Sequence, residues 1–293
     1  MRLMRFFHRL APVDSLCLYR AAIGLLIFVE ACSWLPHTSE LFSSSGFHVP
    51  NLAWLPVPTP FLAFLLCLAL VITSLMVTVG LFTRPALLGT LVIWIYIYGL
   101  DSINEKAAQT IVLIVLTVLL CSPCGNRYSV DFLRRRRKKL PETPGMASIF
   151  SLRLLQLEFA QIYFFAGLSK ITNYEWVNGS TFYRLLNCRW ATGFGVYLSS
   201  LNLDLPARAG GLGTILFELF IGLLLFIPFI RPLAIATGLA FHVGIQLTLW
   251  IGTLGFHFIF ALLLLFPEPE TVAKIMNALL DTRIGKKLYF QSH

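Results

Sequence analysis

Charged residues are scarce in this chain. They make up 13% of its 293 residues, whereas hydrophobic residues make up 57%. Soluble domains contain about 25% charged and roughly 45–50% apolar residues, and a soluble core cannot hold such an excess of apolar side chains. The composition therefore excludes an ordinary soluble protein and predicts that lipid surrounds much of the chain.

Long apolar runs account for this composition. Crossing a ~30 Å hydrocarbon layer takes roughly 20 helical residues, and the shorter runs can gain a turn from their flanks. We therefore predict an all-α integral membrane protein, a compact bundle of about eight transmembrane helices. The predicted spans are Leu16–Leu35, Phe61–Phe82, Pro85–Leu100, Ala107–Cys121, Leu152–Ile171, Leu212–Ile230, Pro232–Ile251 and Thr253–Phe266.

Basic residues bracket these runs on one side. Clusters precede the first run, separate the fourth from the fifth, and follow the last: Arg2, Arg5 and Arg9; 134–139; Arg283, Lys286 and Lys287. Because cytoplasmic loops carry an excess of Lys and Arg, both termini are predicted to be cytoplasmic. The net charge of +9 is explained by topology and by attraction to anionic lipid, so nucleic acid is not an expected partner.

The chain contains no long linker, repeat or low-complexity stretch. We predict one domain over residues 1–287, with two four-helix halves joined by a basic cytoplasmic connector at 127–148. Residues 288–293 resemble the remnant of a protease-cleavable expression tag, and no cleavable signal peptide is expected. Glycines within the runs should let helices approach closely: Gly80, Gly89, Gly167, Gly222, Gly238 and Gly244.

Strong catalytic signatures are also missing. The chain has no serine elbow, phosphate loop, catalytic triad or metal-ligand spacing. Cys121-Ser122-Pro123-Cys124 has the spacing of a redox motif, but it falls at the predicted cytoplasmic end of a span, where thiols stay reduced. A helix end terminated by proline is the favoured interpretation, and a redox role is the alternative.

Polar residues inside apolar runs are costly and so indicate candidate sites. The helical rise places one set toward the outer face: Glu30, Asn104, Glu105, Lys170, Glu218, His242 and Gln246. We predict an outward-facing polar cavity there. Structural roles remain open alternatives. Lys170 can be an anchor whose ammonium reaches the headgroups. Glu30 and Glu218 can pair with arginines, and His242 can join two helices by a hydrogen bond.

Several segments together carry a resemblance. The most specific runs from Tyr163 to Lys170 and on through Trp176-Val177-Asn178-Gly179, and shorter matches lie at 12–24, 125–131, 217–219 and 241–242. They resemble the horizontally transferred transmembrane (HTTM) family, the membrane domain found in vitamin K-dependent gamma-carboxylase. The resemblance covers nearly the whole chain.

This resemblance implies a membrane-embedded enzyme with Lys170 as its catalytic base. In the carboxylase, the matching lysine is taken to deprotonate reduced vitamin K, which then reacts with oxygen. The strong base so formed removes a proton from a peptide glutamate, which captures carbon dioxide. The expected cofactors are thus a reduced quinone with O2, and CO2 if the match extends that far, with no metal. The expected pocket includes Tyr163 and Trp176. A peptide or small molecule would enter from the outer side.

Two features of the carboxylase have no counterpart here. The turn Asn104–Ala108 carries no histidine where the carboxylase has one, and no large soluble C-terminal region is found. These departures put the glutamate chemistry and the use of CO2 in doubt. Small HTTM proteins in bacteria include one that matures a secreted peptide toxin. The expected location is therefore a bacterial cytoplasmic membrane. The alternative functions are a non-catalytic maturation or export factor and, less favoured, a transporter.

Overall fold

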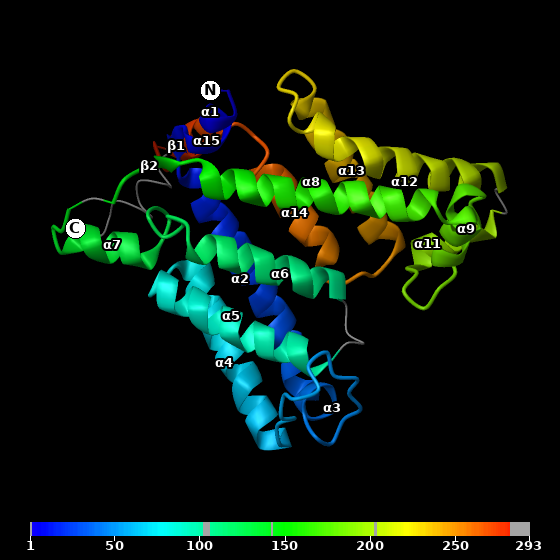
Figure 1. Ribbon diagram of the computed structural model, residues 1–293, viewed down its shortest axis with the longest axis horizontal. Coiled ribbons are helices and arrows are strands. Elements are labelled where there is room, and N and C mark those ends of the chain that lie inside the picture. The colour runs from blue at the N-terminus through cyan, green and yellow to red at the C-terminus, as the bar shows by residue number, and fades with distance from the viewer. Residues whose placement is uncertain (1, 102–105, 142, 202–203, 282–293) are drawn as a thin grey trace. The chain divides into compact units, whose positions relative to one another are not determined.

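The computed structural model describes residues 2–101, 106–141, 143–201 and 204–281. The chain is mainly helical (Figure 1), with one short antiparallel pair in which Leu10 of β1 lies opposite Ser148 of β2. The elements are α1 (Arg2–His8), β1 (Leu10–Pro12), α2 (Asp14–Trp34), η1 (Leu35–His37), α3 (Thr38–Phe42), α4 (Pro60–Val79), α5 (Thr83–Leu100), α6 (Lys106–Leu120), α7 (Val130–Arg137), β2 (Met146–Ser148), α8 (Phe150–Ile171), α9 (Tyr174–Val177), α10 (Ser180–Leu185), α11 (Gly193–Ser200), α12 (Asp204–Leu224), α13 (Arg231–Thr248), α14 (Leu254–Leu264) and α15 (Pro269–Asp281).

Each predicted apolar run contains a helix, namely α2, α4, α5, α6, α8, α12, α13 and α14. Within the described residues, four helical segments are long and apolar enough to cross a membrane: Asp14–Phe42, Pro60–Val79, Thr83–Leu100 and Ala207–Leu224. The helical membrane class therefore agrees with the prediction. The count of eight spans and the cytoplasmic side of both termini stay predictions.

Helices α12 and α13 both end before their predicted last residues, and α12 also begins before its predicted first residue. Helix α12 covers Asp204–Leu224 rather than the predicted Leu212–Ile230. Pro228 has no N–H to donate to the Leu224 carbonyl, and its ring crowds that carbonyl, so the helix cannot continue past this point. Helix α13 ends at Thr248, and Gly252 then adopts a left-handed φ of 59°. A turn, not a kink, thus separates α13 from α14.

The chain forms two compact units. The first comprises residues 1–153 and 268–293, and the second comprises residues 154–267. The division falls within α8, so the first unit holds α2, α4, α5, α6 and α15, and the second holds most of α8 with α12, α13 and α14. The single-domain prediction was made from the absence of linkers, and it stays a prediction.

Buried polar contacts organise the first unit. Arg20 of α2 is fully buried, and its guanidinium donates to the carbonyls of Cys17 (3.3 Å), Val77 (3.1 Å) and Tyr128 (2.7 Å). Asp14, also fully buried, accepts from Arg127 at 2.8 Å and from the Tyr128 hydroxyl. The buried guanidinium and carboxylate thus have hydrogen-bond partners in place of water. Buried hydrogen bonds and an ion pair therefore join the segments at 12–24 and 125–131, which have a structural role.

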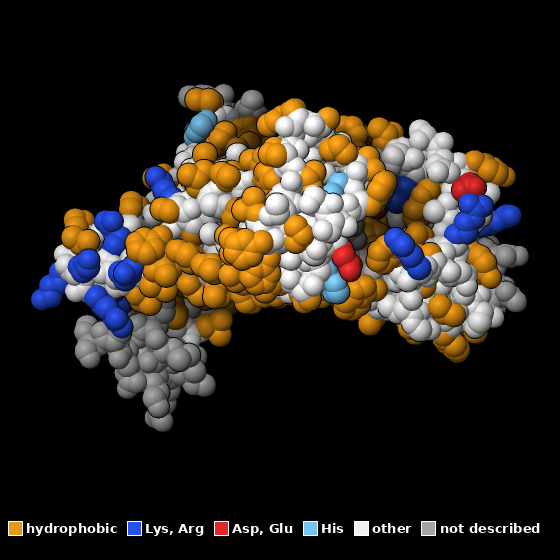
Figure 2. All heavy atoms as spheres, turned by 90° about the horizontal axis from the view of Figure 1, so that it is seen from below, with side chains coloured by type: hydrophobic (Ala, Val, Ile, Leu, Met, Phe, Trp, Pro, Cys, Tyr) orange, Lys and Arg blue, Asp and Glu red, His pale blue; other side chains and the backbone are white. Residues whose placement is uncertain are grey.

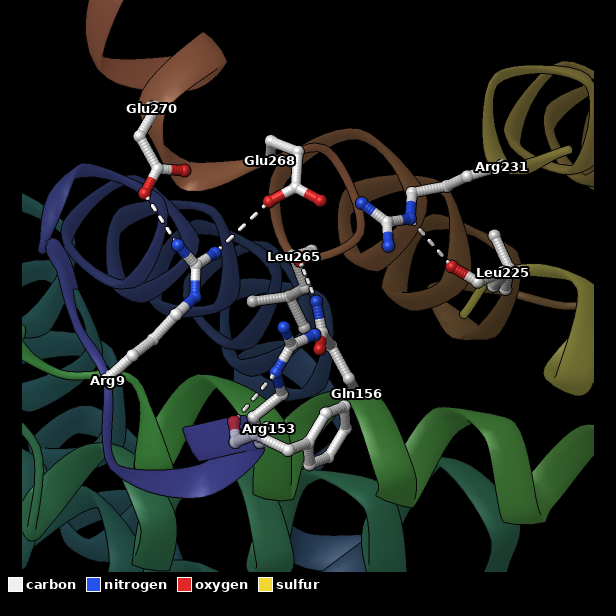
Figure 3. Close-up of polar contacts among 9 residues, drawn as sticks. Arg9, Arg153, Gln156, Leu225, Arg231, Leu265, Glu268 and Glu270 are labelled. Carbon is white, nitrogen blue, oxygen red and sulfur yellow. Dashed lines mark hydrogen bonds and ion pairs between the residues drawn. The ribbon is translucent and has the colours of Figure 1, made fainter. Parts of the chain in front are cut away.

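Ion pairs attach α15 to the start of the chain. Arg9 donates to Glu270 at 2.8 Å and to Glu268 at 3.1 Å, as Figure 3 shows. Arg153 at the start of α8 donates to the Phe6 carbonyl at 3.4 Å. Both glutamate side chains are more than 40% exposed, so these pairs position the chain more than they stabilise it.

Close helix approach characterises the second unit. A Cβ added to Gly167 of α8 would lie 2.8 Å from the Leu219 nitrogen of α12, and one added to Gly222 would lie 2.7 Å from the Ala160 carbonyl oxygen. Gln156 donates to the Leu265 carbonyl at 2.6 Å, and Arg231 donates to the Leu225 carbonyl at 2.9 Å (Figure 3). Small residues at a helix contact thus let α8 and α12 pack almost backbone to backbone.

The Cys121–Cys124 segment forms the turn after α6. Cys121 is exposed, Cys124 is buried, and both are free thiols. The Cys124 Sγ lies 3.3 Å from the Leu119 carbonyl oxygen, and burial raises the pKa of this thiol, which disfavours the reactive thiolate. This geometry favours the helix-end interpretation over the redox one.

Candidate functional site

A largely apolar cavity of about 870 Å³ lies within the second unit. It is lined by residues of α8, α9, α10, α12 and α13, by the turn after α13, and by the first residue of α14. Its lining consists of Lys170, Trp176, Phe182, Leu185, Leu186, Gly210, Gly213, Thr214, Phe217, Glu218, Thr237, Ala240, Phe241, Gly244, Ile245, Thr248, Leu249, Ile251 and Leu254. Its volume falls in the usual range for small-molecule sites, about 300–1,000 Å³.

An ion pair supplies the charged groups of this cavity. The Nζ of Lys170 lies 2.9 Å from Glu218 Oε1 and 2.7 Å from Oε2, so both carboxylate oxygens face the ammonium. The two side chains are only 18% and 11% exposed. Nζ also approaches the Ala166 carbonyl at 3.4 Å and lies 5.2 Å from the centre of the Trp176 ring. A lysine so surrounded has its ammonium engaged within the protein, not extended to headgroups as an anchor would be.

The close contact at Gly167 makes this pair possible. Lys170 lies one turn beyond Gly167 on α8, and Glu218 precedes Leu219 on α12. Because the Gly167 position touches the Leu219 backbone, the two charged side chains emerge from adjacent helices at the same height. A larger residue at 167 would push the helices apart.

A second polar pair is buried beside the cavity. The Tyr163 hydroxyl and His242 Nε2 are 2.6 Å apart, and both residues are at most 5% exposed. The His242 ring stacks on Phe258 with centroids 4.6 Å apart, and Tyr163 meets Phe217 edge to face at 5.9 Å. Phe217 lines the cavity, whereas Tyr163 and His242 lie behind it.

Aromatic and small residues shape the cavity itself. Phe217 and Phe241 stack with centroids 4.1 Å apart and form one wall. A Cβ added to Gly213 or Gly244 would meet no atom within 4 Å, so these glycines leave space open for a ligand. Gly244 therefore does not serve the close helix approach that the sequence predicted for it.

Comparison with known protein families shows which family this chain belongs to. The HTTM domain matches residues 8–270 of the chain. The chain belongs to the HTTM family. With its long apolar helices, this HTTM chain is a membrane protein, and the family is related to the membrane domain of vitamin K-dependent carboxylase. A search among curated proteins and solved structures finds no match.

The HTTM chain gathers only part of the predicted polar set. Lys170, Trp176 and Glu218 line the cavity, and Tyr163 and His242 lie behind its aromatic wall. Gln246 instead donates to the Gly252 carbonyl at 3.2 Å and does not line the cavity, because it faces the turn after α13. Glu30 lies on α2 in the first unit, and Asn104 and Glu105 fall outside the described residues.

Sequence reasoning missed the residues that give the cavity its shape. Phe217 and Phe241 belong to the segments that resemble the family, but neither was predicted to line a site. Gly213 and Thr214 are uncharged residues and were not predicted to line one either. All four residues lie on α12 or α13 and line the same cavity as Glu218. Among the described residues, no group of three His, Cys, Asp or Glu side chains could hold a metal ion.

Proposed function

We propose that this HTTM protein is a membrane-embedded enzyme that activates a reduced lipophilic quinone with Lys170 and uses oxygen to modify a peptide or small molecule at the outer face. The observation that carries the proposal is the Lys170–Glu218 pair at the wall of a largely apolar cavity. A charged side chain is costly among apolar helices, and titratable groups in such surroundings are candidates for chemistry.

The cavity suits an apolar ring system. Phe217, Phe241 and Trp176 offer flat apolar surfaces, and the open positions at Gly213 and Gly244 leave room between them. A cavity of about 870 Å³ accommodates a quinol ring and part of a tail. The quinol, when bound, supplies the oxidisable hydroxyl chemistry, and the protein supplies binding, orientation and proton transfer.

Glu218 has a defined part in this proposal. A ligand that fills the cavity expels water, and the loss of water disfavours both the ammonium and the carboxylate. A proton can then pass over 2.7 Å from Lys170 Nζ to Glu218, which leaves a neutral amine. That amine accepts a proton from a quinol hydroxyl within hydrogen-bond reach. The Tyr163–His242 pair fixes the wall behind Phe217 and does not touch the ligand.

The test uses purified protein in detergent with vitamin K hydroquinone as the probe. We expect oxygen-dependent oxidation of the probe by the wild type and a loss of at least about 100-fold in Lys170→Ala, because general base catalysis contributes about 10²–10⁴-fold. Lys170→Arg keeps the positive charge but not the base, and should be equally inactive. Full activity of Lys170→Ala would sink the enzyme proposal.

A non-catalytic maturation factor is the second candidate. A deep apolar cavity also suits the side chains of a bound peptide. If wild-type protein leaves the probe untouched, yet Lys170→Ala and wild type support maturation of a secreted peptide equally well in cells, the binding role replaces the enzymatic one.

A further inference from the structure

A separate cavity of about 560 Å³ lies in the first unit, and it shares no residue with the Lys170 cavity. It is formed where α5 begins, at the turn after α6, and along α7 with the residues that follow it. By the predicted topology this is the cytoplasmic side, where the basic connector meets the ends of the spans.

Cationic side chains dominate this second cavity. Arg84 comes from the start of α5, Arg134 and Arg135 from α7, and Lys138 from the residue after α7. Within the part of the chain that the structure describes, none of the four forms an ion pair with a carboxylate. Figure 2 shows Lys and Arg side chains gathered beside apolar surface at the end of the unit that carries α7.

The one carboxylate in the lining is already engaged. Asp131 accepts hydrogen bonds from the backbone N–H of Phe82 at 2.9 Å and of Thr83 at 2.7 Å, and from the Thr83 hydroxyl at 2.8 Å. Its charge caps the start of α5 and does not pair with the arginines. Four positive charges against one negative charge leave the cavity suited to an anion.

An apolar stripe runs away from this cavity along α5. Leu88 and Val92 follow Arg84 at four-residue intervals and so share its helix face, and Ile95 lies on the same face. They are 51%, 56% and 48% exposed. Phe82, which lines the cavity, is also exposed, and the Arg134 guanidinium lies 5.1 Å from its ring centre. A ligand with an anionic head and apolar chains would satisfy both surfaces.

We propose that this cavity binds the phosphate headgroup of an anionic phospholipid, with the acyl chains lying along the Leu88–Ile95 face of α5. Basic pockets at the cytoplasmic ends of membrane helices are suited to such headgroups. A soluble phosphate compound offers the same anion without the chains. Because the basic residues lie directly beside an exposed apolar helix face, the lipid is the favoured occupant.

The experiment counts lipid adducts on the detergent-purified protein by native mass spectrometry. Dioleoyl phosphatidylglycerol is the test lipid, dioleoyl phosphatidylcholine the zwitterionic comparison with no net charge, and glycerol 3-phosphate the soluble phosphate. We expect a one-to-one adduct with phosphatidylglycerol that is about tenfold stronger than either alternative, because the basic residues attract an anionic headgroup at the membrane surface; tenfold corresponds to about 1.4 kcal/mol.

Matched double variants locate the site. Arg134→Gln/Lys138→Gln removes two charges that line the cavity, whereas Arg137→Gln/Lys139→Gln removes two from the same segment that do not. The first should weaken the adduct about tenfold and the second should not. Arg84→Gln on α5 should act in the same direction as the first. Thermal unfolding in detergent micelles checks that each variant folds.

Three outcomes would overturn the proposal. If the two double variants weakened the adduct equally, the lipid would be attracted by the overall charge and not bound at this cavity. If phosphatidylcholine bound as strongly as phosphatidylglycerol, the site would not require an anionic headgroup. Binding of glycerol 3-phosphate as tightly as the lipid would assign the cavity to a soluble phosphate compound.

Discussion

The ammonium of Lys170 lies within 2.9 Å of both oxygens of Glu218, in a part of the chain where few charges occur. A largely buried pair of this kind need not stabilise the fold, since desolvation of two charges offsets their attraction. The proposed function gives this pair a role in the cavity wall that does not depend on stability. This argument concerns two residues, and it can be tested on those two alone.

Removing either partner should cost more stability than removing both. Lys170→Met leaves a carboxylate, and Glu218→Gln leaves an ammonium, each without its counter-charge in a poorly hydrated place. We expect each single variant to lose about 1–3 kcal/mol and the double variant to recover part of that loss. Thermal unfolding in detergent measures this. Strictly additive losses would show that the two side chains do not interact in the folded protein.

Helices α8 and α12 show how a single glycine controls the distance between two elements. Gly167 touches the Leu219 backbone, whereas Gly244 on α13 faces open space in the cavity. Both were predicted from sequence to serve close helix packing, and the structure supports this role for Gly167 only. The depth of a residue along its helix can be calculated from the rise, but its neighbours cannot.

Replacing each of the two glycines by leucine should therefore distinguish a glycine needed for helix packing from one that leaves room for a ligand. Gly167→Leu should destabilise the protein by about 1–3 kcal/mol, because the side chain meets backbone atoms that cannot move aside. Gly244→Leu should leave the unfolding midpoint nearly unchanged but fill the cavity, and so slow oxidation of the vitamin K hydroquinone probe. A destabilised Gly244→Leu variant would contradict the open position described here.

For the molecule as a whole, the distribution of basic residues is the basis for predicting its orientation in the membrane. The basic residues at 134–139 and in the N-terminal segment predict one cytoplasmic side, and the proposed lipid site depends on that side facing anionic lipid. Reporter fusions can test it. A fluorescent protein fused after residue 139 should fold in the cytoplasm, and alkaline phosphatase fused after residue 200 should be active outside. The reverse result would invert the topology and move the Lys170 cavity to the inner half of the membrane.

Sequence alone determined that this is a helical membrane protein, where its main helices lie, and that Lys170 and Glu218 are candidates for a site. Apolar runs and costly buried charges are local properties that a single chain displays directly. Pro228 and Gly252 are local signals as well: Gly252 was compatible with either a turn or a kink, and the predicted span 212–230 ran past Pro228. Only the tertiary structure decided which candidates meet, because the face that each helix turns to its neighbours depends on packing across the unit. That packing joined Glu218 to Lys170, placed Tyr163 with His242 behind Phe217, and turned Gln246 toward Gly252.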